Sequence, residues 1–212
     1  MKDWPADHPK AKLMARKQAA ILDAAREAFL RDGYESTTME GIAASAGVSI
    51  MTLYRHAAGK DTLFAAVIAS ACQPTDQAER ARIEASLQDS LEDVLVFVGL
   101  MFQERLASPT TTALFRVVMV ETMRSPHLVD MAYWGLIGTH EEALDAFLSQ
   151  RGETATLNAG QRRKLSAAFF NRLVGLDNLR VLLGLEGVSA AERLDRATSA
   201  TTELLSALSA CQ

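Results

Sequence analysis

The stretch that decides the fold covers residues 46 to 56 and reads Ala46-Gly47-Val48-Ser49-Ile50-Met51-Thr52-Leu53-Tyr54-Arg55-His56. Glycine permits a sharp turn, valine supplies a core contact, and serine is favoured at the start of a helix. The pattern is typical of the turn and second helix of a DNA-binding helix-turn-helix. A helix this short is not stable alone, so its function is expected to lie in the side chains that it displays.

Two helices are predicted before this segment. The first has one apolar face, formed at helical spacing by Ile21, Ala24, Ala25, Ala28 and Phe29. It is expected to stop at Gly33, which tolerates positive φ, and Tyr34 can then fold back onto Phe29. Thr37 and Glu40 stand in the S/T-x-x-E arrangement of a capping box, which predicts the start of the second helix.

A fourth helix is predicted to begin at Gly59, Lys60 and Asp61 and to lead away from the first three. Its apolar face is formed by Leu63, Phe64, Val67, Ile68 and Ala71. The resulting expectation is an all-α protein of about nine helices. It has an N-terminal arm at 1–12, a helix-turn-helix domain at 13–58, and a linker helix with a ligand-binding and dimerisation domain at 59–212.

Several short segments follow one another in a specific order over roughly residues 15 to 68: Ile21 to Phe29, Gly33-Tyr34, Thr37-Thr38, Ile42-Ala43, Ala46 to Ser49, Thr52 to His56 and Lys60 to Leu63. In this order they resemble the N-terminal domain of TetR-family transcriptional regulators. The resemblance implies that Thr38, Tyr54, His56 and Lys60 grip DNA phosphates. It also implies that Ser49, Ile50, Met51, Thr52 and Arg55 face bases. Hydroxyls, an imidazole and an ammonium are suitable donors to phosphate oxygens.

Two positions depart from the family pattern. Ala57 stands where an aromatic residue is usual, so a packing contact between the third and fourth helices is lost or supplied by another side chain. Ile50 and Met51 are apolar where glycine or polar residues are common. Contact with thymine methyl groups is therefore predicted. The alternative is that both side chains only pack beside the backbone.

Composition describes an ordinary globular protein. Of the 212 residues, 49% are hydrophobic and 23% charged. The longest apolar run, Val94 to Phe102, is far shorter than the ~20 residues of a membrane span, and no signal peptide opens the chain, so a cytoplasmic protein is expected. Cys72 and Cys211 suggest neither a disulfide framework nor a metal site. Residues 1–60 carry nine Lys or Arg against seven Asp or Glu, whereas residues 61–212 carry 13 against 19, which makes the DNA-binding end the more positive one.

The larger domain has helical patterns throughout. A long helix is predicted from Leu87 to Leu106. Ser108-Pro109 and Ser125-Pro126 each place a capping hydroxyl before a proline, which predicts helices near 109–123 and 126–150. The last two helices are expected near 161–184 and 190–209, the second starting at the capping box of Ser189 and Glu192.

Two sets of side chains in this domain are candidates for binding. The last two helices are predicted to form a homodimer through Leu165, Phe169, Leu173, Leu176, Leu194, Thr201 and Leu205, although ordinary core packing explains part of each stripe. TetR-like proteins dimerise through their last two helices, which favours the interface. Aromatic, methionine and polar side chains predict a ligand pocket formed by Phe97, Met101, Phe115, Met119, Glu121, Met123, Tyr133, Trp134, His140, Asn171 and Asn178. Taken singly, an apolar residue of this kind is more often plain core than ligand wall, and a polar one is more often exposed or internally hydrogen-bonded.

The sequence favours a regulator over an enzyme. It has no Gly-rich phosphate loop, no H-E-x-x-H and no G-x-S-x-G, and its four histidines lack paired metal-ligand spacing, so no cofactor or metal is predicted. An architectural or activating DNA-binding protein is the alternative, but an architectural one would not need so large a helical domain. The segment Leu114 to Glu121, with its continuation to Phe147, resembles more weakly the C-terminal domain of AefR-like and AcrR-like members. The expected function is a homodimeric repressor that binds a palindromic operator of double-stranded DNA and is released by a small hydrophobic or amphipathic effector.

Overall fold

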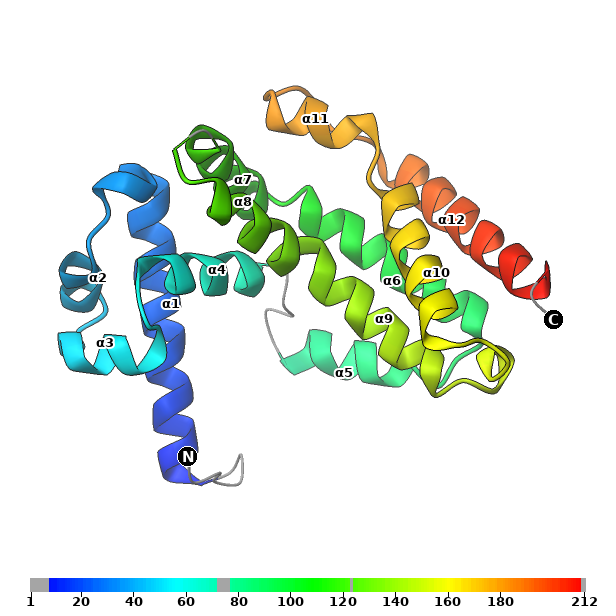
Figure 1. The fold of residues 1–212 in the computed structure, drawn as a ribbon, viewed down its shortest axis with the longest axis horizontal. Coiled ribbons are helices and arrows are strands. Elements are labelled where there is room, and N and C mark those ends of the chain that lie inside the picture. Colours follow the sequence, from blue (N-terminus) through cyan, green and yellow to red (C-terminus); the bar gives the residue numbers. More distant parts are fainter. Residues whose placement is uncertain (1–7, 72–76, 123, 211–212) are drawn as a thin grey trace. The chain divides into compact units, whose positions relative to one another are not determined.

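The computed structural model describes residues 8–71, 77–122 and 124–210, and the elements in these ranges are helical (Figure 1). The chain divides into two compact units. The first combines residues 1–71 with 113–132, and the second combines residues 72–112 with 133–212. None of the helices in the described ranges is both long enough and apolar enough to cross a membrane.

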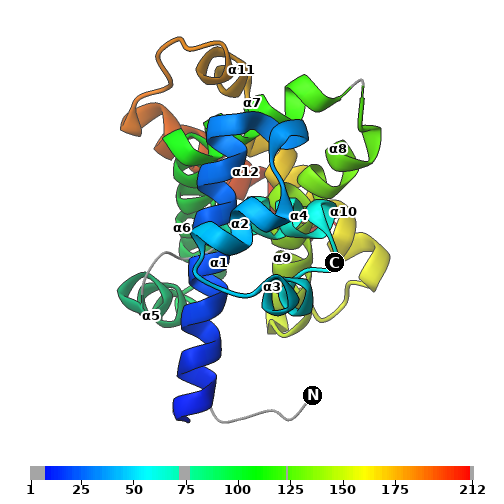
Figure 2. The ribbon, with the colours of Figure 1, turned by 90° about the vertical axis from the view of Figure 1, so that its left-hand side faces the viewer.

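The first unit contains the predicted helix-turn-helix. Its helices are α1 (Pro9–Ser36), α2 (Met39–Ser45), α3 (Ile50–His56) and α4 (Lys60–Ala71), joined by most of α7 (Pro109–Glu121) and of α8 (Pro126–Tyr133). Figures 1 and 2 both show α2 and α3 lying beside each other next to α1. Because α1 begins at Pro9, regular structure starts before residue 13, where the sequence placed the domain boundary.

An aromatic cluster holds the end of α1 against α4. Gly33 leaves the helical conformation with φ 76°, as predicted, and this turn stacks the ring of Tyr34 on that of Phe29 at 5.9 Å between centroids. Phe64 of α4 packs edge-on against both rings, at 4.8 Å from Phe29 and 5.2 Å from Tyr34. Ala57, the position that departs from the family pattern, is also buried.

The start of α2 differs from the predicted capping box. The N-cap is Thr38, whose hydroxyl oxygen accepts from the backbone N–H of Gly41 at 3.1 Å. The hydroxyl of Thr37 is used elsewhere, because it donates to the carbonyl oxygen of Gly33 at 2.6 Å. Thr37 alone has a glutamate three residues later, but its hydroxyl is bonded to Gly33, and the adjacent Thr38 caps the helix.

The second unit is a packed helical body. It contains α5 (Gln77–Ser86), α6 (Leu91–Leu106), the π-helical turn η1 (Trp134–Gly138), α9 (Thr139–Ser149), the 3-10 turn η2 (Gly152–Thr154), α10 (Ala159–Leu173), α11 (Leu176–Leu182) and α12 (Ala190–Ala210). Helix α6 packs against α12 and α10, and α10 packs against α9 and α12. Helices α6 and α12 approach closely at Gly99 of α6, where an added Cβ would lie 3.1 Å from the Cβ of Ala197.

The described residues form more helical segments than the nine helices that the sequence predicted. Three of the predicted helices of the larger domain have different bounds in the structure. The helix expected from Leu87 starts at Leu91, because Ser90 caps it by accepting from the N–H of Asp93. The helix expected over 126–150 is α8, η1 and α9 in succession. The helix expected over 161–184 breaks at Val174 and Gly175 into α10 and α11.

Candidate functional site

Helix α3 presents a polar edge and an apolar tip. Ser49 caps it, since its hydroxyl oxygen accepts from the N–H of Thr52 at 3.2 Å. The hydroxyl of Thr52 lies 2.9 Å from that of Ser49 and accepts from the guanidinium of Arg55 at 3.2 Å, which orients the arginine. Met51 is 77% exposed, whereas Leu53 is fully buried and anchors the helix. The exposed side chains are therefore held on a fixed support.

The residues that resemblance assigns to phosphate contact differ in their surroundings. Thr38 and Tyr54 are exposed, and His56 is half-buried. Lys60 is already engaged, because its ammonium donates to the carbonyl oxygens of Tyr34 at 2.9 Å and Glu35 at 3.1 Å and lies over the Tyr34 ring. An ammonium has three N–H donors, so a phosphate would be a third partner. Lys60 thus pairs with two carbonyl groups at the C-terminal end of α1.

A hydrogen-bonded trio connects α1, α4 and α8 within the first unit. The hydroxyl of Tyr34 donates to Oδ1 of Asp61, and Nε2 of His127 lies 2.9 Å from Oδ2 of the same carboxylate. The hydrogen bond from Tyr34 holds the pKa of Asp61 below its ordinary value of 3.8, and His127 acts in the same direction. Burial raises the pKa of the Tyr34 hydroxyl. Nothing in the sequence pattern predicted this role for His127.

Replacing Asp61 with asparagine is expected to lower the thermal midpoint of unfolding at pH 7. Because folding lowers the pKa of Asp61, the stabilisation by its ionised form is complete above the ordinary value of 3.8 and is lost as the pH falls through the lower folded pKa. The difference between wild type and Asp61→Asn should therefore narrow in acid. Thermal unfolding of both proteins, from pH 7 down to the lowest pH at which both stay folded, measures it. A difference that stays constant with pH would contradict the assignment.

An apolar cavity of about 560 Å³ lies in the second unit. Its described lining is mostly aliphatic and aromatic. It comes from α5, α6, α9 and α10, with one residue between α5 and α6 and one just after α9: Ile83, Leu87, Val94, Phe97, Val98, Met101, Phe102, Arg105, Thr139, His140, Ala143, Leu144, Ala146, Phe147, Gln150 and Phe170. The volume lies in the ordinary range for small-molecule sites, ~300–1,000 Å³. The cavity can therefore hold a small apolar molecule.

Of the residues that the sequence proposed for a ligand pocket, the structure brings three to this cavity, namely Phe97, Met101 and His140. The others lie elsewhere. Met119, Tyr133, Trp134 and Asn171 are exposed, Phe115 and Asn178 are partly exposed, and Glu121 is buried in the first unit. Met123 lies outside the described residues, as does Cys72 at the end of the predicted linker helix. Residue type and helical spacing alone could not distinguish the residues that line the cavity from those that are exposed.

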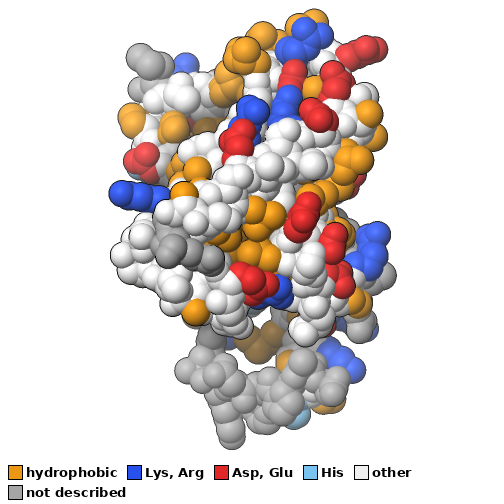
Figure 3. Space-filling view, turned by 90° about the vertical axis from the view of Figure 1, so that its right-hand side faces the viewer, with side chains coloured by type: hydrophobic (Ala, Val, Ile, Leu, Met, Phe, Trp, Pro, Cys, Tyr) orange, Lys and Arg blue, Asp and Glu red, His pale blue; other side chains and the backbone are white. Residues whose placement is uncertain are grey.

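The residues proposed for the dimer interface fall into two groups. Phe169, Leu173 and Thr201 are buried within a single chain and belong to the core of the second unit. Leu165 and Leu205 are partly exposed, Leu194 is exposed, and Leu176 of α11 is 83% exposed. Figure 3 views the side where α10 and α12 lie and shows hydrophobic side chains gathered between charged ones. Apolar surface is therefore available on this side for a second chain.

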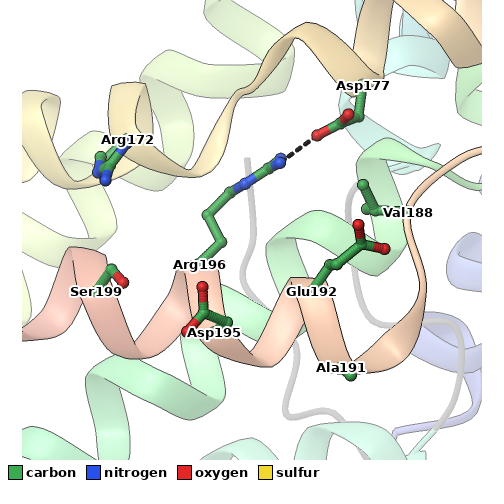
Figure 4. A pocket seen from close by; sticks show the side chains of 8 residues that line it. All are labelled: Arg172, Asp177, Val188, Ala191, Glu192, Asp195, Arg196 and Ser199. Atoms are coloured by element: carbon green, nitrogen blue, oxygen red, sulfur yellow. Dashed lines mark hydrogen bonds and ion pairs between the residues drawn. The ribbon is translucent and has the colours of Figure 1, made fainter.

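The break between α10 and α11 borders a second, polar hollow (Figure 4). Arg196 of α12 forms an ion pair with Asp177 at the start of α11. The arginine passes so close to Gly175 that an added Cβ would lie 2.6 Å from its guanidinium. Glycine at this position therefore permits the contact that separates α11 from α10, and the sequence offered no periodic signal for it.

Comparison with known proteins gives a consistent result. The family model described as bacterial regulatory proteins of the tetR family matches residues 21–67, and that of the AefR-like transcriptional repressor C-terminal domain matches residues 93–208. The HTH-type transcriptional regulator UidR of Escherichia coli K12 is 28% identical over 159 residues, covering 73% of this chain and 74% of UidR.

Solved structures share the fold. One from Mesorhizobium loti MAFF303099, described as a TetR-family transcriptional regulator, is 24% identical, covers 91% of this chain and 96% of its own, and has a TM-score of 0.65. The flavonoid-responsive regulator FrrA is 23% identical, with coverage of 90% and 95% and a TM-score of 0.62. With the helix-turn-helix geometry and a C-terminal match over more than half of its length, the chain belongs to the TetR family of bacterial transcriptional regulators.

Proposed function

We propose that the protein is a homodimeric repressor that binds a palindromic operator and is released by a small apolar effector. The observation that carries this proposal is an apolar cavity of about 560 Å³ in a chain whose other unit presents a recognition helix. A two-fold dimer would place two α3 helices in successive major-groove faces, about 34 to 36 Å apart. The exposed leucines of α11 and α12 supply surface for such a dimer.

The recognition helix has the chemistry for reading bases. Arg55, oriented by Thr52, can donate to guanine, and the exposed thioether of Met51 can contact a thymine methyl group. The exposure of Met51 favours base contact over packing beside its own backbone. Thr38 and Tyr54 add hydroxyl donors that position the unit on phosphates.

Effector binding would reach the DNA-binding unit along a continuous stretch of helix. Helix α9 lines the cavity with His140, and η1 joins it directly to α8. His127 of α8 contacts Asp61 at the start of α4. An effector that binds more tightly to one arrangement of α9, η1 and α8 would move α8. That movement would change the position of α4, and α4 in turn would change the position of α3. Such coupling requires only that the effector binds the two arrangements with different affinities.

Replacing Arg55 with methionine is expected to weaken operator binding about tenfold to a hundredfold, because a bidentate base contact is worth roughly 1–3 kcal/mol. The measurement is a titration of DNA from upstream of the coding region, at fixed salt because phosphate contacts make affinity strongly salt-dependent. Arg124→Met, at an exposed position between α7 and α8, is the matched control and should bind like wild type. Unchanged operator affinity of Arg55→Met would contradict the assignment of α3 as the recognition helix.

The alternative function, an architectural DNA-binding protein, predicts a different result. Such a protein would bind DNA equally well whatever apolar compound is added.

A further inference from the structure

The described wall of the cavity carries four polar side chains, Arg105, Thr139, His140 and Gln150. Among the described lining residues, Arg105 is the charged side chain and no carboxylate is present. Its positive charge is close enough to His140 to lower the pKa of that imidazole further, in addition to the larger effect of burial. Thr139 also lines the cavity, but its hydroxyl donates to the carbonyl oxygen of Gly135 at 3.1 Å. His140 and Arg105 therefore lie near each other, and this pair is called the polar end of the cavity; Gln150, just past α9, is a further polar lining residue.

The ring of His140 has a fixed orientation. It meets Phe102 edge to face at 5.3 Å between centroids and Phe170 at 5.9 Å. Its Nδ1 is enclosed without a close hydrogen-bond partner among the described residues, and the backbone carbonyl of Leu136, one turn earlier, raises the pKa of the ring. A molecule in the cavity therefore meets the ring at its Nε2 edge. A neutral imidazole has one donor and one acceptor nitrogen. A ligand group that both donates and accepts can pair with Nε2 in either tautomer.

The remainder of the wall suits a flat ring. Phe97, Phe102, Phe147 and Phe170 line the cavity together with the flexible thioether of Met101. Aromatic rings pack edge to face or offset against other rings, and methionine adapts to their shape. A planar aromatic molecule would therefore make more contact here than a branched aliphatic molecule of the same volume.

We propose that the cavity binds an aromatic compound carrying a hydroxyl group, with the hydroxyl between His140 and Arg105 and the ring among the phenylalanines. The hydroxyl donates to His140 Nε2 or accepts from it, and its oxygen accepts from the guanidinium of Arg105. This inference rests on the proposed function only in taking the cavity as the effector site. It names the chemical class that the site selects.

The test uses three probes of nearly equal shape on the full chain without DNA: 2-naphthol, 2-methoxynaphthalene and naphthalene. Isothermal titration should give about tenfold tighter binding of 2-naphthol than of the other two, because they leave the polar end without a hydroxyl. His140→Phe keeps an aromatic ring, so it should bind naphthalene normally and lose the preference for 2-naphthol. Arg105→Met should weaken 2-naphthol binding, and Arg124→Met should not.

Two outcomes would overturn the proposal: equal binding of all three probes by the wild type, or a preference for 2-naphthol that survives in His140→Phe. Tighter binding of 2-naphthoate than of 2-naphthol would also overturn it, because a carboxylate accepts but does not donate. Naphthalene binding by His140→Phe shows whether the variant is folded. Operator binding, measured separately without any probe, tests the proposed regulator, so failure of one proposal is distinguishable from failure of the other.

Discussion

Replacing Phe64 with alanine is expected to lower the free energy of unfolding of the DNA-binding unit by about 3 to 5 kcal/mol, the usual cost of removing a buried phenyl ring. Phe64 is fully buried and packs against both Phe29 and Tyr34. These rings hold the end of α1, where Tyr34 bonds to Asp61 and Lys60 closes the helix. The substitution should therefore also weaken operator binding, because α3 leads directly into α4.

Chemical denaturation followed by circular dichroism measures this loss. Met51→Ala is the control, since Met51 is exposed on the adjacent helix and its truncation should change stability by no more than about 0.5 kcal/mol. Phe64→Leu should fall between the two, because it retains most of the buried volume. If Phe64→Ala were as stable as Met51→Ala, the aromatic cluster would not be what holds α1 to α4.

Local signals in the sequence were sufficient to predict the DNA-binding unit. Gly33 predicted where the first helix leaves the helical conformation, because few other residues adopt positive φ, and the structure has φ 76° there. Ser49 marked the start of α3 because its hydroxyl can satisfy a backbone N–H at a helix start. Both signals depend on residues within one turn of each other. The cap of α2 was displaced by one residue, because Thr37 and Thr38 offer the same chemistry, and α1 begins earlier than predicted, at Pro9.

The cavity could be predicted only in part. Phe97 and Met101 were found because aromatic and methionine side chains are typical of a ligand pocket, but Trp134 and Met119 have the same character and are exposed. Which apolar residue faces a cavity depends on how α6, α9 and α10 pack, and that packing joins residues far apart in the sequence. Arg105 was missed because a charged residue near a helix end normally suggests solvent.

The break between α10 and α11 at Gly175 could not be predicted for a similar reason. The leucines from Leu165 to Leu183 continue at helical spacing through it, so periodicity predicted one helix. At this break, Arg196 of α12 lies beside Gly175 and pairs with Asp177. An interaction across 19 residues of sequence leaves no local pattern.

Replacing Gly99 with valine is expected to destabilise the second unit by about 3 kcal/mol, at the upper end of the cost of overpacking a core. An added Cβ at Gly99 would lie 3.1 Å from the Cβ of Ala197, 3.3 Å from Leu173 Cδ2 and 3.5 Å from the Ala197 Cα. The two further methyl groups of valine would press on the backbone of α12, which cannot rotate aside as a side chain can. Helices α6 and α12 would have to separate.

Separation of α6 would also alter the cavity, because Val98 and Met101, the neighbours of Gly99 on α6, form part of its wall. Gly99→Val should therefore lower both the thermal midpoint and the affinity for 2-naphthol. Gly99→Ala should be far milder, since it adds only the Cβ and about 1 kcal/mol of gained helix propensity offsets part of the cost of its close contacts. Gly152→Val is the matched control, because an added Cβ there meets nothing within 4 Å. Equal thermal midpoints of unfolding for Gly99→Val and Gly152→Val would mean that α6 and α12 do not require a glycine for their close packing. The shape of the cavity would then depend on α9 and α10 instead.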